Sequence, residues 1–328
     1  MNSNARRALA AATIGLAGAV AQSVLAQEAY PSRPVQVILP LQAGSASDVA
    51  VRVLAERLSE DMKQSFVVEN VPGAAGLLGA ERLAKSKPDG YTLAALNNSI
   101  LTILPNIRRS QVKFDPLADF VPIRGIAVIP TFLGVSKDMP VSNVRELIEY
   151  AKSRPGELNY SSGGSGSPQH LATEMFQVMA GVKLTHVPYK GATQATADLA
   201  AGQVQVMLIA HSLALPFLPS GRVKLIAFAG KERSAALPDI PTVAEAGVPG
   251  YSYESWIALF APKGTPEEVV RKLRDAAEKQ LAQPGLKERL AKSGLAIWDQ
   301  PAPRLTEVVR EDLARWKQVV ASGNIKAD

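Results

Sequence analysis

The sequence predicts an α/β protein in which parallel sheets are covered by helices on both faces. Short apolar runs alternate with amphipathic helical patterns along the chain, which is typical of such sheets. The 328 residues are enough for two domains of ordinary size. One local pattern, a strand that turns through a Gly/Ser loop into a helix, occurs once in each half of the chain.

The first copy of this pattern opens the chain's folded part. Val35–Leu39 reads as a short buried strand, Ala43–Ser47 as a loop of small residues, and a helix is expected from about Asp48. Such a turn leaves several backbone N–H groups free at the helix N-terminus, where the helix dipole adds a partial positive charge. The position therefore favours a carboxylate, a phosphate or a sulfate.

The next elements extend the same sheet. A strand is predicted over Phe66–Glu69, a helix over Ala80–Ala84, and a third strand over Tyr91–Leu96 that ends in the polar loop Asn97–Ser99. Ligands of parallel sheets sit beyond the carboxyl ends of the strands. The loops Gly44–Ser47 and Asn97–Ser99 are therefore expected to belong to one site.

The second copy of the pattern follows a change of domain. Ile123–Val135 is extended, and its break at Pro130 suits a crossing into a second domain. After a helix over Val144–Lys152 and a strand over Leu158–Ser161, a Gly/Ser loop leads to Ser167, a fitting N-cap for a helix that ends at Gly181. Two such loops that face each other across a cleft would hold an anion from both sides.

The remaining elements complete both domains. Further strands are expected, and two helices close the chain, one beginning with a capping box and the other from about Arg304. The strands are Lys183–Val187, Val204–Ala210, Val223–Ala229 and Glu254–Ala261, and the capping box is Thr265-Pro266-Glu267-Glu268.

The N-terminus has the composition of a secretory signal peptide. Asn4–Arg7 carries two positive charges, Ala8–Leu25 is apolar without an acid, and small residues precede Gln27. We expect residues 1–26 to be removed, which lowers the formal charge from +6 to +4; a membrane anchor is the alternative interpretation. The chain has no cysteine for a disulfide, a thiolate metal site or a lipid. It is therefore expected to diffuse freely in a bacterial periplasm.

Catalytic and nucleotide-binding motifs are missing. The G-x-S-x-G nucleophile motif is not met, because Gly163–Ser167 ends in serine, and no Walker A or dinucleotide fingerprint is present. No histidines or carboxylates have metal-ligand spacing, and His170 could be structural or touch a ligand. Basic residues are scattered among acids, which argues against nucleic-acid binding. The sequence favours binding without a metal or cofactor over catalysis.

Five segments resemble a known family, the Bug periplasmic solute-binding receptors of tripartite tricarboxylate transporters. They are PSRPVQVILPLQAGSASDVAVRVLAERLSE, VVENVPGAAGLLGAERLAKSKPDGYTL, LNYSSGGSGSPQHLATEMF, HVPYKGATQATADLAAGQVQVM and LPDIPTVAEAGVPGYSYESWIALFAPKGTP. The resemblance covers Tyr30–Ile325. It implies a type II periplasmic binding protein fold with two doubly wound α/β domains around a central cleft, which close on a small carboxylate. The expected boundaries are 27–129 with 254–328 for domain 1 and 130–253 for domain 2.

The resemblance also implies a site. The expected ligand-binding residues are Ala43, Gly44, Ser45, Ser47, Asn97, Ser99, Ser162, Gly164, Ser165, Ser167, His170, Ile209 and Ala210. Ser47 and Ser167 could instead act only as helix caps, and Tyr189 and Trp256 could line the cleft or pack in the core.

The sequence departs from the family pattern at two places. Many members have an acid and an asparagine where this chain has Ile209 and Ala210, and in members that bind amino acids this acid meets an ammonium. Its absence argues against a cationic ligand group and for a dicarboxylate or an aromatic carboxylate. In the first loop, Gln42 replaces a common proline and Ser45 a common glycine.

Three functions follow as hypotheses. The resemblance implies a receptor that delivers its carboxylate to the membrane permease of a tripartite tricarboxylate transporter, and we expect it to be a monomer. The same closed form could instead dock on a sensor kinase. The third is a secreted hydrolase that uses Ser165 or Ser167 with His170.

Overall fold

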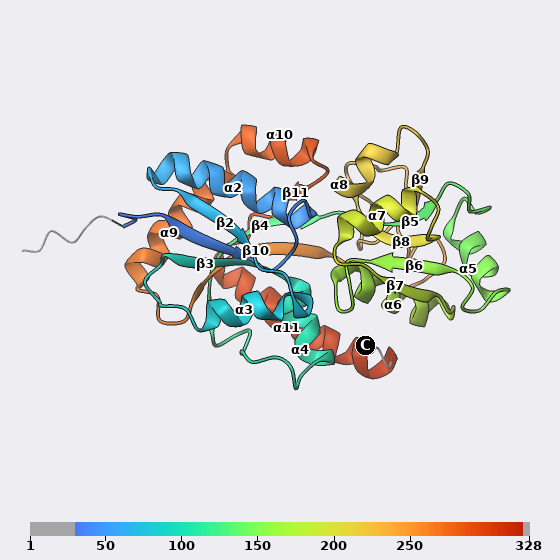
Figure 1. The fold of residues 1–328 in the computed structure, drawn as a ribbon, viewed down its shortest axis with the longest axis horizontal. Helices are drawn as coiled ribbons and strands as arrows, with labels where there is room; N and C mark the ends of the chain where they lie inside the picture. The colour runs from blue at the N-terminus through green and yellow to red at the C-terminus, as the bar shows by residue number, and fades with distance from the viewer. Residues whose placement is uncertain (1–29, 324–328) are drawn as a thin grey trace, which may run out of the picture. The chain divides into compact units, whose positions relative to one another are not determined.

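A computed structural model describes residues 30–323, of which residues 33–323 belong to one compact unit. The strands of this unit make two separate sheets (Figure 1). The predicted signal peptide, residues 1–26, lies outside the described residues. Within residues 30–323, none of the helices combines the length and the apolar character that crossing a membrane requires.

The first sheet has six strands in the order β11-β4-β10-β3-β1-β2. The strands are β1 (Val35–Leu39), β2 (Phe66–Asn70), β3 (Thr92–Asn97), β4 (Phe120–Ile129), β10 (Ser255–Pro262) and β11 (Ala296–Ile297). β1 pairs in parallel with β2 and β3, as the sequence predicts. β10 runs antiparallel to both β3 and β4, because this segment returns from the second half of the chain.

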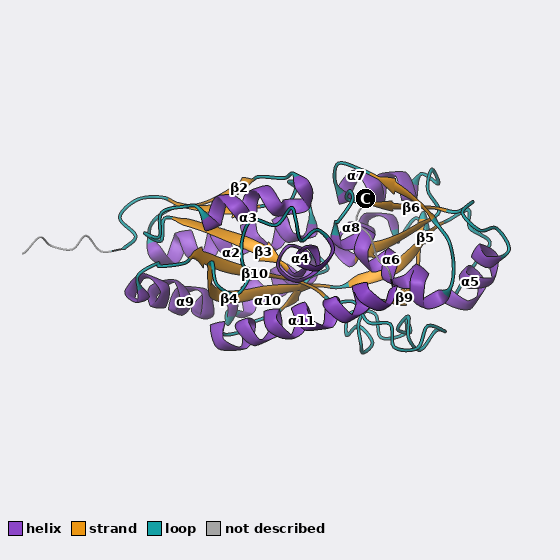
Figure 2. Ribbon diagram, turned by 90° about the horizontal axis from the view of Figure 1, so that it is seen from below, coloured by secondary structure: helices purple, strands orange, loops and turns teal. Residues whose placement is uncertain are grey.

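Helices cover both faces of this sheet (Figure 2). They are α2 (Ala46–Met62), α3 (Leu77–Ala84), α4 (Leu104–Ile107), α9 (Glu267–Leu281), α10 (Pro284–Lys292) and α11 (Ala302–Gly323), with short turns at Ala74–Gly76 and Ser99–Ile103. α3 and α11 pack against Ile38, Leu96 and Phe260 in one apolar cluster. We call this sheet and its helices the first lobe.

The second sheet has five strands in the order β7-β6-β8-β5-β9. The elements are β5 (Thr131–Ser136), β6 (Asn159–Ser162), β7 (Thr185–Pro188), β8 (Val206–Ala210), β9 (Val223–Phe228), α5 (Val144–Lys152), α6 (Pro168–Ala180), α7 (Ala192–Ala200), α8 (His211–Ala214) and a turn at Leu215–Phe217. β6 is parallel to β7 and β8, whereas β5 is antiparallel to β8 and β9. We call this sheet and its helices the second lobe.

The chain passes between the sheets at the expected break. β4 ends at Ile129 and β5 begins at Thr131, so that only Pro130 separates a strand of one sheet from a strand of the other. The chain returns to the first sheet with β10, which begins at Ser255. The predicted domain boundaries at 129/130 and 253/254 remain a prediction, which the composition of the two sheets supports.

Several helix starts differ from the sequence-based expectation. Helix α2 begins before Asp48, because the N-cap is Ser45, whose side chain accepts a hydrogen bond from the Asp48 N–H. Helix α5 keeps its expected bounds and is capped by Asn143, whose side chain accepts a hydrogen bond from the Glu146 N–H. The predicted capping box at α9 is wrong: the Thr265 hydroxyl donates to the carbonyl of Pro262, 2.8 Å away, and leaves the helix without a side-chain cap. The structure also has α10 and β11, which are not predicted from the sequence.

Candidate functional site

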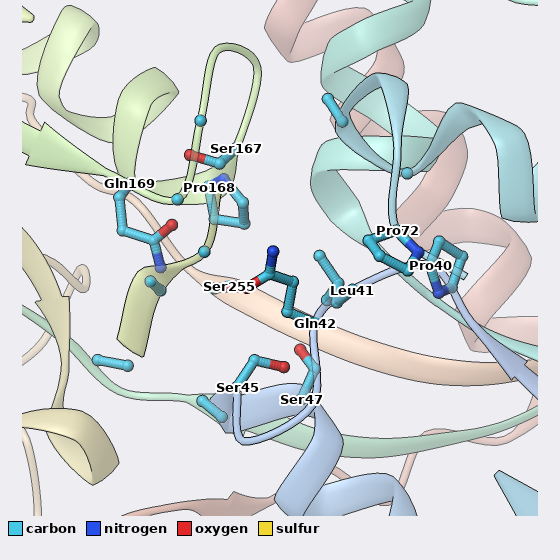
Figure 3. Close-up of a pocket in the computed structure, with 18 of the residues that line it drawn as sticks. Pro40, Leu41, Gln42, Ser45, Ser47, Pro72, Ser167, Pro168, Gln169 and Ser255 are labelled. Carbon is cyan, nitrogen blue, oxygen red and sulfur yellow. The ribbon is translucent and has the colours of Figure 1, made fainter. Parts of the chain in front are cut away.

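A cavity of about 350 Å³ is lined by residues of both lobes (Figure 3). Its walls come from the β1–α2 loop, the β2–α3 loop, the β6–α6 loop and the β7–α7 loop, together with the end of β8. The segments where the chain crosses between the sheets contribute Ile129, Thr131, Tyr253 and Ser255. The volume lies in the range of small-molecule sites.

The lining is apolar with a positive electrostatic bias. Among residues 30–323, the charged residues that line it are Arg108 and Lys190, and none of the lining residues is Asp or Glu. Apolar side chains make up much of the rest, namely Pro40, Leu41, Ala46, Pro72, Ala74, Ala75, Ile129, Pro168, Ala192, Leu208, Ala210 and Leu213. Serine, threonine and tyrosine hydroxyls, two glutamine amides and several glycines complete the lining. Such a surface suits an anion with an apolar body and disfavours a cation.

The β1–α2 loop takes its shape from one buried carboxylate. Asp48, which is 5% exposed, accepts hydrogen bonds from the Gly44 N–H at 3.0 Å and from the Asn70 amide at 2.9 Å. Arg52 forms an ion pair with the same carboxylate at 3.0 Å. Gly44 has a φ of +76°, a conformation that favours glycine. Asp48 thus holds the loop from behind, and it does not line the cavity.

The environment of Asp48 keeps it ionised. Burial raises its pKa, but the hydrogen bonds from Arg52, Asn70 and the Gly44 backbone together outweigh burial and hold the pKa below its ordinary value. The negative charge is therefore compensated by groups on the far side of the loop. This leaves the start of α2, with Ser45, Ala46 and Ser47, to face the cavity.

The β6–α6 loop is held in the same manner by side chains beneath it. The Gly166 N–H donates to Nδ1 of His170 at 3.1 Å, and the Gly164 N–H donates to the Ser162 hydroxyl at 3.1 Å. Gly164 has a φ of +113°, and a side chain there would press against the Tyr189 carbonyl oxygen. His170 is 1% exposed, so its role is to position the loop.

The helix that follows this loop begins as the sequence predicts. Ser167 is the N-cap of α6, with its hydroxyl 3.4 Å from the His170 N–H, and Pro168 is the first helical residue. Ser167 also lines the cavity, so that its capping role and its contact with the cavity coexist.

The residues predicted for the site divide into two groups. Those that line the cavity are Ser45, Ser47, Gly164, Ser165, Ser167 and Ala210. Those that do not are Ala43, Gly44, Asn97, Ser99, Ser162, His170 and Ile209. Several members of the second group support the lining, as the hydrogen bonds of Gly44, Ser162 and His170 show.

The Asn97–Ser99 loop lies behind the cavity. The Asn97 side chain accepts from the Ile100 N–H at 3.0 Å, and the Ser99 hydroxyl donates to the Gly166 carbonyl at 2.9 Å. The second bond joins the first lobe to the β6–α6 loop. The sequence predicts that this loop belongs to the site, but Asn97 and Ser99 do not line the cavity. Its link to the site is the hydrogen bond from Ser99 to the β6–α6 loop, which does line it.

Ile209 packs away from the cavity. Its side chain is fully buried in an apolar cluster with Leu199 and Met207. Its strand neighbours Leu208 and Ala210 line the cavity instead, because successive side chains of a strand point to opposite faces.

Neither Tyr189 nor Trp256 lines the cavity. The Tyr189 hydroxyl donates to Asp198 at 2.7 Å, and burial with the adjacent carboxylate raises the pKa of Tyr189 to about 12. Trp256 stacks on Trp298 with ring centroids 5.0 Å apart and donates to Asp312 at 3.1 Å. Core packing is thus the role that the structure gives both aromatic residues.

Several lining residues are not predicted by the sequence. They include Arg108, Lys190, Gln169, Thr131, Tyr253 and Ser255, together with Gln42, which the sequence marks only as an unusual loop residue. Tyr253 is 2% exposed, and its hydroxyl lacks a hydrogen-bond partner within residues 30–323; Asn98 and Ser255 lie near it without meeting hydrogen-bond geometry. Burial raises the pKa of Tyr253, so the hydroxyl keeps its proton and can donate it to a bound molecule.

The structure does not form the serine–histidine pair of the hydrolase hypothesis. Nδ1 of His170 accepts from the Gly166 backbone, while the Ser167 hydroxyl faces the His170 N–H. The serine–histidine hydrogen bond of this region joins Ser162 to His186 at 2.6 Å, and neither residue lines the cavity. Among the described residues, no group of three or more His, Asp and Glu side chains is arranged to hold a metal ion.

Known proteins resemble this chain over most of its length. The family model described as the tripartite tricarboxylate transporter family receptor matches residues 50–325. Protein BugT of Bordetella pertussis is 31% identical over 328 residues, which cover 98% of this chain and 99% of BugT.

Solved structures share the fold as well. The structure of R. palustris Rpa4515 with adipate has 36% identity and a TM-score of 0.86, covering 90% of this chain and 99% of that one. MatC (Rpa3494) from Rhodopseudomonas palustris with bound malate has 32% identity and a TM-score of 0.82, covering 89% of this chain and 100% of that one. The fold class predicted from the sequence is thereby confirmed.

These likenesses also decide between the functional classes. Members of this family are solute-binding proteins and not enzymes, which removes the hydrolase hypothesis. The family match spans both lobes and the loops that line the cavity, except the β1–α2 loop, which precedes residue 50. The chain belongs to the tripartite tricarboxylate transporter receptor family, as its resemblance to the Bug proteins implied.

Proposed function

We propose that the protein captures a dicarboxylate or an aromatic carboxylate in the periplasm and delivers it to the membrane permease of a tripartite tricarboxylate transporter. The lining of the cavity carries this proposal. Two helix N-termini, those of α2 and α6, open onto it, Arg108 and Lys190 line it, and none of the described residues that line it is acidic. Helix N-termini favour negative charge through their free N–H groups and the helix dipole.

The apolar part of the lining supports a ligand with a hydrocarbon or aromatic body. Leu41, Leu208 and Leu213 line the cavity together with prolines and alanines. Removing such surfaces from water is worth about 25 cal/mol per Å² of apolar area. The relatives solved with adipate and with malate support a carboxylate for this chain as well.

Closure of the two lobes on the ligand is part of the proposal. Two hydrogen bonds join the lobes beside the cavity, from the Ser99 hydroxyl to the Gly166 carbonyl and from the Thr193 hydroxyl to the Gly44 carbonyl at 3.3 Å. Separation of the lobes would break both. A ligand that touches both lobes stabilises the closed state through its greater affinity for that state. Docking on a sensor kinase and the monomeric state stay sequence-based predictions.

A thermal-shift screen on residues 27–328 tests the proposal. Mono-, di- and aromatic carboxylates are compared with amines and neutral sugars, and at least one carboxylate should raise the Tm; a concentration of 100 Kd stabilises by about 2.7 kcal/mol. Ser45→Glu places an acid on the lining loop and should abolish the shift by like-charge repulsion. Gln111→Glu, at an exposed residue outside the cavity, is the matched control. Stabilisation by amines or sugars alone would refute the proposal.

A further inference from the structure

The side chain of Gln42, in the first lobe, occupies the space next to Gly191, in the second lobe, where a side chain at position 191 would lie. A Cβ built on Gly191 would lie 2.6 Å from Cδ of Gln42 and closer still to its Oε1. Gly191 has a φ of −173°, extended backbone that any residue adopts. The backbone at residue 191 would therefore accept another residue, but its side chain would displace the Gln42 amide from this position.

Gln42 reaches Gly191 from the β1–α2 loop. In Figure 3 its amide extends toward the segment that carries Pro168 and Gln169. Gln42, Gly191 and the neighbouring Lys190 all line the cavity, so this part of the lining is polar. It contrasts with the apolar lining that Pro40, Pro72 and their neighbours provide.

The Gln42 amide has unused hydrogen-bonding capacity. Its side chain makes no hydrogen bond to any residue between 30 and 323, although the residue is partly buried. A primary amide offers two N–H donors and one carbonyl acceptor. A polar group in an open cavity takes its hydrogen-bond partners from water or from a bound molecule, so a ligand in this cavity can bind the amide directly.

We propose that Gln42 is a specificity-determining residue, which donates its amide to a second polar group of the ligand and keeps this position because residue 191 has no side chain. The inference rests on the proposed function, in which the first carboxylate binds at the helix N-termini. This role of Gln42 narrows the expected ligand class. Carboxylates with a second anionic or hydroxyl group should bind more tightly than monocarboxylates of equal length. Lys190, which lines the same part of the cavity, adds a positive charge there.

The first test measures the amide's contribution with two probes of equal length, adipate and hexanoate. Calorimetric titration should show that the wild-type protein prefers adipate and that Gln42→Leu reduces this preference by about tenfold or more, the size of a hydrogen bond to a charged group. Gln111→Leu, at an exposed glutamine outside the cavity, should leave the preference unchanged.

The second test examines the dependence on Gly191 by a double-mutant cycle. Gly191→Ala should preserve the fold, because the atoms it meets are at the end of a flexible side chain, and should weaken adipate binding by about tenfold through displacement of the amide. In a Gln42→Ala background the same change should alter adipate affinity by less than about twofold, because the displaced group is gone.

The outcomes separate this inference from the proposed function. If the wild-type protein binds adipate and Gln42→Leu keeps its preference over hexanoate, the inference is wrong and the proposed function stands. If Gly191→Ala weakens binding equally in the wild-type and in the Gln42→Ala background, the dependence on Gly191 is wrong. If neither probe binds and no carboxylate stabilises the protein, both proposals fail together.

Discussion

The carboxylate of Asp48 should control both the stability of the first lobe and the ligand affinity. We consider Asp48→Asn, which keeps the size of the side chain and removes its charge. The asparagine amide offers one acceptor oxygen, whereas the carboxylate accepts from the Gly44 N–H, the Asn70 amide and Arg52. At least one buried donor then faces the new NH₂ group without an acceptor.

The size of the effect follows from this lost acceptor. An unsatisfied buried polar group costs about 1–3 kcal/mol. A loss of about 2 kcal/mol in the free energy of unfolding lowers the Tm of a protein of about 300 residues by about 3 °C, because the entropy of unfolding is about 2.1 cal/mol/K per residue. Because the Gly44 N–H is one of the released groups, the loop that faces the cavity also loses its fixed shape, and carboxylate affinity should fall with stability.

The effect should also depend on pH in one direction. The pKa of Asp48 is lowered in the folded protein, so its contribution is fully present above the ordinary carboxyl pKa and disappears as the pH falls through the lower folded-state value. The difference in unfolding free energy between wild type and Asp48→Asn should therefore be constant near neutral pH and shrink in acid.

Calorimetry or denaturant titration across pH measures this difference. Glu268→Gln is the matched control, because the Glu268 side chain is 55% exposed and pairs with Lys272 on the surface of α9. It should leave the unfolding free energy close to that of wild type, because solvent screens an exposed ion pair. Equal stability of wild type and Asp48→Asn at pH 7, or a difference that does not shrink in acid, would refute the reasoning.

Three further predictions concern the lining. Ser45→Ala removes the N-cap of α2 and should lower the unfolding free energy by about 1 kcal/mol, whereas Ser47→Ala should leave it within about 0.5 kcal/mol, which denaturant titration checks. Tyr253→Phe removes a buried hydroxyl without a partner in residues 30–323; it should raise the Tm of the ligand-free protein while it weakens carboxylate binding, as parallel thermal and calorimetric titrations would show. Ala210→Asp should abolish carboxylate binding in a folded protein, whereas Ile209→Asp buries a charge in the core and should prevent folding, a contrast that circular dichroism and thermal shift together resolve.

Local signals explain what the sequence predicted well. Ser167, Pro168 and Gly181 mark the ends of α6 by capping preferences that act within a few residues, and the structure has the helix between them. The parallel pairing of β1 with β2 and β3 follows from the alternation of strands and helices. The antiparallel β10 does not, because its partners lie more than a hundred residues away.

The lining itself depends on information that is not local. In β8, a shift of one residue moves a side chain to the other face, which is why Ala210 lines the cavity and Ile209 does not. Tyr253 and Ser255 line it because the chain crosses between the sheets there, and their spacing carries no motif. Ser45 is the N-cap of α2. Ser47 satisfies the same N-cap preference, so the sequence alone does not distinguish the two serines.

The arrangement of the two loops separates the residues that fix geometry from those that touch the ligand. Asp48 and His170 hold their loops through hydrogen bonds to Gly44 and Gly166, and neither lines the cavity. Apart from the helix caps Ser45 and Ser167, lining side chains such as Gln42 can change without altering where the helix N-termini point. A fold of this kind can therefore keep its anion-binding backbone while the lining sets which carboxylate fits, which is how function comes to reside in the site rather than in the fold.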